Sequence, residues 1–205
     1  MKKRPDIVLA SSSPRRKEIL EMLGADFRVL VSDADENVEN FASPEDFVEQ
    51  TSQKKGEAVL SMLRERGEMR DNTLVIAADT VVVFRDYIIG KPLDEAHAVL
   101  TLGMLSDSWH SVLTGLSVTY KGRTAHRVVR TDVKFRELSE EEIMAYVESG
   151  EPMGKAGSYA IQMKGSSLVE RVEGEYYNVV GLPVAGLTSL LKEEFGLSTM
   201  DWMAY

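Results

Sequence analysis

Residues 6–23 read DIVLASSSPRRKEILEML, and this stretch is the first evidence for the fold class. Residues 6–10 form a short apolar run, which is typical of a buried strand. Residues 14–23 follow with isoleucine and leucine on one helical face, and Gly24 then marks the end of the helix. The sequence therefore predicts a strand, a tight polar turn and a helix at the amino-terminal end.

Strand and helix patterns alternate along the rest of the chain. Strands are expected at residues 27–31, 74–84, 110–120, 124–135 and 168–172, and helices at residues 44–66, 94–105, 139–150 and after Pro183. Lys121-Gly122-Arg123 is the expected hairpin turn between two of these strands. Such mixing predicts an α/β protein with a mixed central β-sheet flanked by helices, in a single domain over residues 1–205.

Composition and charge exclude several classes of protein. The net charge of -9 disfavours a general nucleic-acid-binding surface, which needs basic residues to neutralise phosphates. No apolar run approaches the roughly 20 residues that span a bilayer. The chain has no cysteine, and its three histidines lack zinc-binding spacing. We therefore expect a cytoplasmic protein that binds neither nucleic acid nor a membrane.

The start of the first helix breaks a local rule. Ser13-Pro14 is followed by Arg15-Arg16, whereas Ser43-Pro44 is followed by Glu45-Asp46. Both serines are expected to cap their helices, but the positive end of a helix dipole favours acidic residues. Two guanidinium groups beside free backbone N–H groups would suit a polyanion, for which triphosphate is the natural candidate. The alternative is that both arginines are solvated or pair with the acidic residues 32–40.

Asp79-Thr80 interrupts the apolar strand expected at residues 74–84. A carboxylate in a core strand costs free energy unless it is paired, hydrogen-bonded or bound to a metal. Asp79 could bind magnesium through oxygen, or take a proton from an attacking water molecule. The alternative is a structural aspartate at a strand bend that accepts hydrogen bonds from backbone amides.

Other polar residues give weaker signals. The acidic stretch at residues 33–36 could supply a further oxygen ligand, but such runs are usually solvated loops. Lys55 lies in a long helix and Lys91 in a turn, where lysines are usually exposed. The Gln162 amide could satisfy the C=O and N–H edge of uracil or thymine, although guanine presents a similar edge. An ordinary surface glutamine is the alternative.

Taken in order, these segments resemble the Maf family of nucleoside triphosphate pyrophosphatases. The resemblance rests on residues 9–16, 78–82, 90–92, 114–115, 151–152, 155–162 and 178–183. It implies a Maf/ITPase-like fold with two closely associated lobes around a nucleotide cleft. It also implies hydrolysis between the α- and β-phosphates to nucleoside monophosphate and pyrophosphate, with a divalent cation, usually Mg²⁺ and in some cases Mn²⁺.

The resemblance further implies roles for individual residues. Asp79 matches the general base, and with Glu36 it matches the metal ligands. The residues that match substrate-binding positions are Ser11, Ser13, Arg15, Arg16, Lys55, Thr80, Lys91 and Gln162. The segment at residues 157–162 is similar to that of the branch acting on dTTP and UTP.

The same resemblance implies a homodimer and a house-cleaning role in which modified nucleotides are removed. The alternative function is a nucleotide-binding regulator of cell division or septum formation without relevant turnover. The charged residues disfavour that alternative, because a sensor has little need for Asp79 beside a phosphate site.

Overall fold

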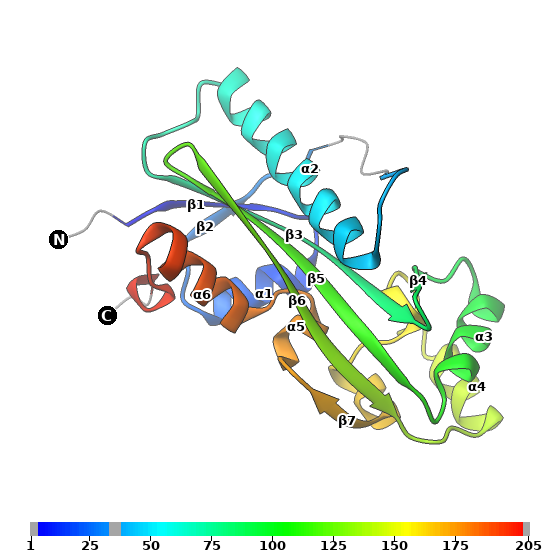
Figure 1. The fold of residues 1–205 in the computed structure, drawn as a ribbon. Coiled ribbons are helices and arrows are strands. Elements are labelled where there is room, and N and C mark those ends of the chain that lie inside the picture. The colour runs from blue at the N-terminus through cyan, green and yellow to red at the C-terminus, as the bar shows by residue number, and fades with distance from the viewer. Residues whose placement is uncertain (1–3, 33–37, 203–205) are drawn as a thin grey trace. The chain divides into compact units, whose positions relative to one another are not determined.

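The computed structural model describes residues 4–32 and 38–202 (Figure 1). The chain divides into two compact units, each built from separate stretches. The first unit comprises Met1–Asp79, Thr114–Val129 and Gly181–Tyr205, and the second comprises Thr80–Leu113 and Arg130–Val180. Three long strands run from one unit into the other, so the boundary falls within strands and not in a linker.

The strands form a mixed sheet. The described strands are β1 (Asp6–Ala10), β2 (Phe27–Val29), β3 (Thr73–Phe84), β4 (Tyr87–Ile89), β5 (Trp109–Tyr120), β6 (Arg123–Phe135) and β7 (Val169–Glu173). Their order in the sheet is β2-β1-β3-β5-β6-β7, and β4 pairs with β3. β1 is parallel to β2 and β3, whereas β3–β4 and β6–β7 are antiparallel. The predicted mixed α/β fold is confirmed.

The helices are α1 (Pro14–Met22), α2 (Pro44–Glu65), α3 (Glu95–Leu105), α4 (Glu140–Glu148), α5 (Tyr176–Val180) and α6 (Val184–Phe195), with 3-10 helices η1 (Ala156–Ser158), η2 (Met163–Leu168) and η3 (Thr199–Trp202). The predicted strands and helices are confirmed with small shifts at their ends. β4, α5 and the 3-10 helices were not predicted, because such short elements carry no periodic pattern. Within the described part of the chain, no helix is both long and apolar enough to cross a membrane.

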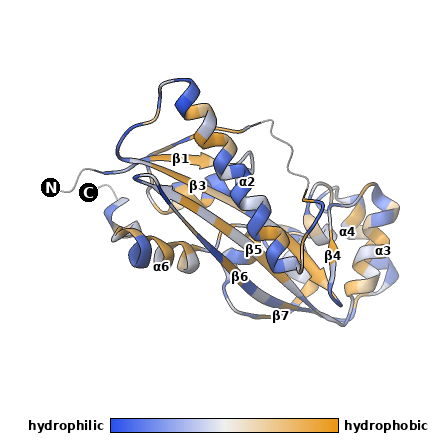
Figure 2. Cartoon of the chain, turned by 45° about the horizontal axis from the view of Figure 1, so that its top comes forward, coloured by the Kyte–Doolittle hydropathy of each residue, from blue (hydrophilic) through white to orange (hydrophobic). Residues whose placement is uncertain are grey.

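The core of the first unit lies on both faces of β1 and β3. On one face, strand residues pack against α2. This cluster consists of Val8, Ala10, Val75, Ala77, Val59, Leu60 and Leu63. Figure 1 shows α1 and α6 on the other side of these strands, where Leu9 and Ile76 are fully buried. Coverage of both faces explains why β1 and β3 are hydrophobic along their length (Figure 2).

Two glycines allow α2 to lie close to the sheet. A Cβ on Gly115 of β5 would overlap the Val48 carbonyl group of α2. A Cβ on Gly56 of α2 would lie 3.2 Å from the Ser117 Oγ and 3.5 Å from the Ala77 Cβ. Because these positions carry no side chain, the helix backbone approaches the strands and brings the neighbouring Lys55 next to β3.

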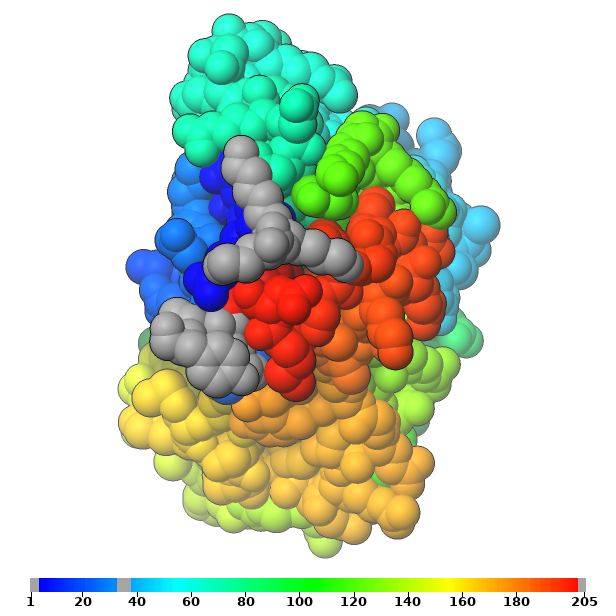
Figure 3. All heavy atoms as spheres, turned by 90° about the vertical axis from the view of Figure 1, so that its left-hand side faces the viewer, coloured from blue at the N-terminus to red at the C-terminus, as the bar shows by residue number. Residues whose placement is uncertain are grey.

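The end of the β5–β6 hairpin packs against α6 in the first unit (Figure 3). Lys121 and Gly122 form its turn with φ of 51° and 76°, as expected for a two-residue hairpin loop. An ion pair between Arg127 and Glu193, with 2.5 Å between nitrogen and oxygen, links β6 to α6. The Tyr120 and Phe195 rings meet edge-on at 6.1 Å. The carboxyl-terminal helix is therefore attached to this half of the sheet.

Candidate functional site

A hydrogen-bonded turn follows β1 in the first unit. The Ser11 Oγ accepts hydrogen bonds from the Ser13 backbone N–H at 3.2 Å and from the Arg16 Nη1 at 3.0 Å. The Arg16 Nε donates to the Gly181 carbonyl at 2.8 Å, and Arg16 is only 8% exposed. The alternative of a solvated Arg16 is therefore wrong. Its guanidinium group joins the turn after β1 to the segment that leads into α6.

Gly181 has a larger role than the sequence indicated. The sequence predicted a helix after Pro183 and gave Gly181 no contact of its own. Pro183 is the N-cap of α6, and Gly181 in addition accepts the hydrogen bond from Arg16. The φ of 125° at Gly181 is one that glycine adopts readily, which explains the residue type.

The first turn of α1 differs from the expected serine cap. Ser13 makes no side-chain cap hydrogen bond, and the first turn contains no acidic residue. In α2, the Ser43 side chain accepts from the Asp46 N–H at 3.2 Å. The expectation of equal caps is wrong for Ser13, whose place in the turn is set by the bond from its own N–H to Ser11. Ser12 and Pro14 are exposed and Arg15 is half-buried at this helix start.

Asp79 in β3 forms an ion pair with Lys55 in α2. The Lys55 Nζ donates to the Asp79 Oδ1 at 2.7 Å, and the two side chains are 14% and 16% exposed. The pairing that an aspartate in a core strand needs is thus supplied by a lysine side chain. The expectation that Lys55 is exposed is wrong, because the close approach of α2 places it against the strand.

The register of the parallel strands brings Asp79 to the edge where β1 ends. Ala10 pairs with Ala77, so Ser11 follows β1 at the level where β3 continues to Asp79. Ligands of open α/β sheets bind at the carboxyl ends of parallel strands. At this edge, the first unit therefore contains Ser11, the start of α1 and the Lys55–Asp79 pair.

The described residues offer a limited set of metal ligands. No group of three or more histidine, cysteine, aspartate or glutamate side chains in residues 4–32 and 38–202 could hold an ion by itself. Glu36 lies outside the described residues. Magnesium usually binds one or two carboxylates together with phosphate oxygens of the substrate. Asp79 at the strand edge fits that kind of site.

In the second unit, the segment with Gln162 contacts the turn with Lys91. The Gly157 N–H donates to the Gly90 carbonyl at 3.1 Å. Gly157 has a φ of 68°, and a Cβ there would lie 2.7 Å from the Val82 Cγ2. Lys91 is exposed and Gln162 is half-buried. Two segments about 70 residues apart in sequence, each containing a predicted substrate-binding residue, are thus joined through their backbones.

Thr80 is half-buried on β3, where the second unit begins, directly after Asp79. Their alternation on the strand places the two side chains on opposite faces. Asp79 and Thr80 therefore place polar side chains on opposite faces of β3.

A buried aromatic cluster anchors Tyr159, which precedes Gln162 by three residues. The Tyr159 OH lies 2.8 Å from the His110 Nε2, and both rings meet Phe135 edge-on at 4.8 Å. Burial lowers the pKa of His110 to about 4 and raises the pKa of Tyr159. Both side chains are therefore neutral near pH 7, and His110 serves as a structural anchor for Tyr159.

Comparisons with known proteins show which family the chain resembles. A family model described as Maf-like protein matches residues 6–194. A dTTP/UTP pyrophosphatase of Acetivibrio thermocellus is 47% identical over 196 residues, covering 95% of this chain and 97% of the relative. A dTTP/UTP pyrophosphatase of Bacillus cereus is 45% identical over 187 residues, covering 91% and 94%. Among solved structures, the Staphylococcus aureus Ham1 protein matches with a TM-score of 0.43 and 19% identity, covering 66% of this chain and 72% of that chain.

Proposed function

This chain belongs to the Maf family, and we propose that it hydrolyses nucleoside triphosphates, preferentially dTTP and UTP, to nucleoside monophosphate and pyrophosphate. The names of two relatives at 45% and 47% identity support the activity and the substrates. The single structural observation that carries the proposal is the Lys55–Asp79 pair at the carboxyl edge of parallel strands.

The proposed reaction begins when the triphosphate competes with Asp79 for Lys55. Phosphate oxygens offer the lysine an alternative anionic partner, so the Asp79 carboxylate becomes available to a water molecule. Asp79 orients this water and takes its proton as the water oxygen bonds to the α-phosphorus. The bond from the α-phosphorus to the bridging oxygen breaks, and pyrophosphate leaves with that oxygen.

The start of α1 is proposed to bind the phosphates. Ser13 and Arg15 contribute directly, because the first-turn N–H groups of this helix have neither a serine cap nor an acidic neighbour. Ser11 and Arg16 hold the turn in place through their mutual hydrogen bond and the bond to Gly181. Positioning and electrostatic stabilisation of this kind are the main contributions of a protein to phosphoryl transfer.

A divalent cation, Mg²⁺ or Mn²⁺, is proposed to be held by Asp79 and Glu36 together with substrate oxygens. When bound, such a cation offsets charge on the phosphates and on the leaving pyrophosphate. The Lys55 ammonium group, then paired with phosphate oxygens, would offset further negative charge on the triphosphate.

Base selection is assigned to residues of the second unit. Gln162 would pair with the C=O and N–H edge of the pyrimidine, and Thr80 and Lys91 would contribute further polar contacts. The position of Gln162 on a segment anchored by Tyr159 supports this assignment.

A substrate panel with a matched pair of variants tests the proposal. Purified protein is incubated with dTTP, UTP, CTP and methyl-GTP, with and without Mg²⁺, while monophosphate and pyrophosphate are measured. Asp79→Asn should lower kcat for dTTP by about 10²- to 10⁴-fold, because it removes the base. Asp71→Asn changes an exposed aspartate just before β3 and should leave kcat unchanged.

Two results would contradict the proposal. A folded Asp79→Asn protein with wild-type turnover would eliminate the base, and nucleotide binding without turnover by the wild type would favour the regulator. The homodimer and the removal of modified nucleotides are further parts of the proposal, supported by the family resemblance. The cytoplasmic location is another part, and its support is the composition of the sequence. Light scattering of the purified protein tests the dimer directly.

A further inference from the structure

The Glu151 carboxylate holds the segment that carries Gln162. Its Oε1 accepts hydrogen bonds from the Tyr146 OH at 2.9 Å and from the Gly165 N–H at 2.8 Å, and its Oε2 accepts from the Lys164 N–H at 3.2 Å. Two of these donors are backbone groups on the carboxyl side of Gln162. A carboxylate with several such donors forms stronger hydrogen bonds than a neutral acceptor.

Tyr146 of α4 fixes the other side of the same segment. Its OH accepts a hydrogen bond from the Ala160 N–H at 3.1 Å while it donates to Glu151. Tyr146 is 6% exposed, and burial raises its pKa, so the hydroxyl group keeps its proton. Ala160 precedes Gln162 by two residues. The Tyr146–Glu151 pair therefore binds the backbone on both sides of Gln162.

The fit around the pair leaves no room for a side chain at Gly165. A Cβ there would lie 2.7 Å from the Tyr146 OH and would overlap the Ala160 carbonyl oxygen. Ala160 and Gly165 thus come together behind the pair, and the residues between them form a closed turn.

The turn contains a strained backbone position directly after Gln162. Met163 has a φ of 57°, although it is not glycine, and its side chain is 79% exposed. A residue in this conformation persists only where the surrounding structure enforces it. The exposed Met163 side chain supplies little packing. The hydrogen bonds on both sides of the turn contribute to that constraint, together with the bond from the Ser166 hydroxyl group to the Met163 carbonyl at 2.6 Å.

We propose that Glu151 and Tyr146 are positioning residues for base recognition, which hold residues 160–165 in the conformation that presents Gln162 to the pyrimidine. This inference rests on the proposed function. A purely structural pair would affect folding stability alone. A positioning pair affects binding and base preference, because Gln162 is displaced when either backbone anchor is lost.

Glu151→Gln is the first test, because it preserves size and removes the charge. The amide oxygen can still accept hydrogen bonds, but the amide NH₂ group would face a backbone N–H. KM for UTP and dTTP should rise about tenfold, preference for UTP over CTP should fall by a similar factor, and kcat should change by less than about threefold. Tyr146→Phe should shift KM and preference in the same direction. The double variant should be less than additive, because both residues act on one turn.

Glu142→Gln is the matched control on α4, the helix that contains Tyr146. Glu142 accepts from the Ser139 N–H and pairs with Arg136, so its loss weakens the start of α4 without touching residues 160–165. The control should lower thermal stability and leave KM and base preference unchanged. A shift in preference with Glu142→Gln equal to that with Glu151→Gln would overturn the inference.

Binding of α,β-methylene UTP and α,β-methylene CTP by calorimetry separates this inference from the proposed reaction. A wild type that binds both analogues without hydrolysing UTP would contradict the reaction, while a loss of UTP-over-CTP preference in Glu151→Gln would still support the positioning role. Wild-type Kd values and preference in both Glu151→Gln and Tyr146→Phe would overturn the positioning role, whatever the turnover. Circular dichroism establishes that each variant is folded.

Discussion

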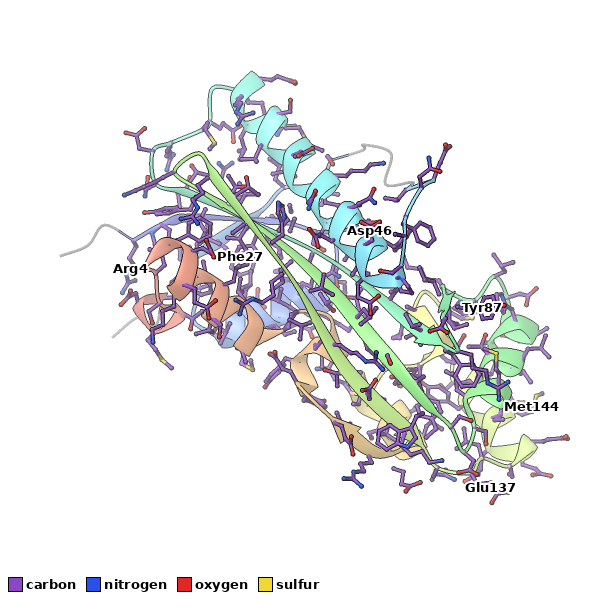
Figure 4. The ribbon with its side chains drawn as sticks, in the orientation of Figure 1. Arg4, Phe27, Asp46, Tyr87, Glu137 and Met144 are labelled. Carbon is purple, nitrogen blue, oxygen red and sulfur yellow. The ribbon has the colours of Figure 1, made fainter. Side chains whose placement is uncertain are left out.

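The two helices of the first unit that begin with Ser-Pro are held in place in different ways. At the start of α2, Ser43 accepts from the Asp46 N–H at 3.2 Å, and the Asp46 carboxylate accepts from the Ala42 N–H at 2.8 Å (Figure 4). At the start of α1, the serine does not cap, and a buried arginine bonds to distant Gly181. The first arrangement is satisfied by its own local residues, whereas the second depends on the tertiary fold.

The same Ser-Pro motif therefore contributes mainly to stability at the start of α2 and to function at the start of α1. The α2 start uses reciprocal side-chain bonds and acidic residues, which stabilise a helix terminus. The start of α1 has neither contribution. Its residues form an ordered turn of polar groups at the sheet edge where β1 ends and Asp79 lies. Changes at the start of α2 should therefore alter only the free energy of unfolding, whereas changes at the start of α1 should also alter turnover.

Among changes at these two helix starts, the largest expected effect is at Arg16. Arg16→Lys keeps the charge, but a lysine cannot reproduce the planar fork that bonds Gly181 and Ser11. We expect kcat/KM for dTTP to fall about 10²-fold, because a small displacement of the turn misplaces the phosphates. Unfolding in urea should show a loss of about 1–3 kcal/mol from buried groups left without this donor. Wild-type turnover in Arg16→Lys would remove the proposed role of the turn.

A smaller effect is expected from the two serines. Ser43→Ala should lower the free energy of unfolding by about 1 kcal/mol, because it removes a side-chain cap. Ser13→Ala should change stability by only a few tenths of a kcal/mol, since no cap is lost, but should raise KM for dTTP severalfold. Urea titrations and initial rates measure both quantities. Equal stability losses would show that the two starts do not differ as described.

The smallest effect concerns pH. The hydrogen bond from the Ala42 N–H lowers the pKa of Asp46 below its ordinary value of 3.8. A carboxyl group with a lower pKa in the folded state contributes stability above the unfolded pKa, and loses it as pH falls through the folded pKa.

Asp46→Asn removes the titrating group. Comparing this variant with the wild type therefore measures the pH-dependent contribution of Asp46 to the free energy of unfolding. The stability difference between wild type and Asp46→Asn should be constant from about pH 7 to about pH 5 and should shrink below about pH 4. Urea midpoints across this range give the difference. A difference that stays constant down to about pH 2.5 would show that Asp46 is not the titrating group.

Local patterns predicted the secondary structure because they depend on neighbours in sequence. The apolar run of β1, the hairpin turn at Lys121-Gly122 and the capping box of α4 each follow from adjacent residues. The unusual positions of Asp79 and of Arg15-Arg16 were also visible, because each breaks a rule for its own element. Residues that follow a local pattern and residues that break one can both be recognised in the sequence without knowledge of long-range contacts.

The roles of Lys55, Gly181 and Glu151 could not be predicted in this way. Each makes its important contact with a residue that a local pattern does not reach: Lys55 with Asp79, Gly181 with Arg16, and Glu151 with the N–H groups of Lys164 and Gly165. Lys55 also depends on Gly56 and Gly115, which allow α2 to approach the strands. A lysine on a helix is usually exposed, and Lys55 is largely buried only because α2 packs closely against the strands.

The sequence by itself determined the order of helices and strands, the family and the residues that break local rules. The tertiary structure decided which of those residues are partners and which helix start is satisfied by its own side chains. The physical reason is that periodicity and capping depend on residues within a few positions, whereas burial and pairing depend on how strands and helices pack. Ser13 and Ser43 each stand before a proline. Ser43 is a cap through its neighbours in sequence, whereas Ser13 lies in a turn that Arg16 connects to distant Gly181.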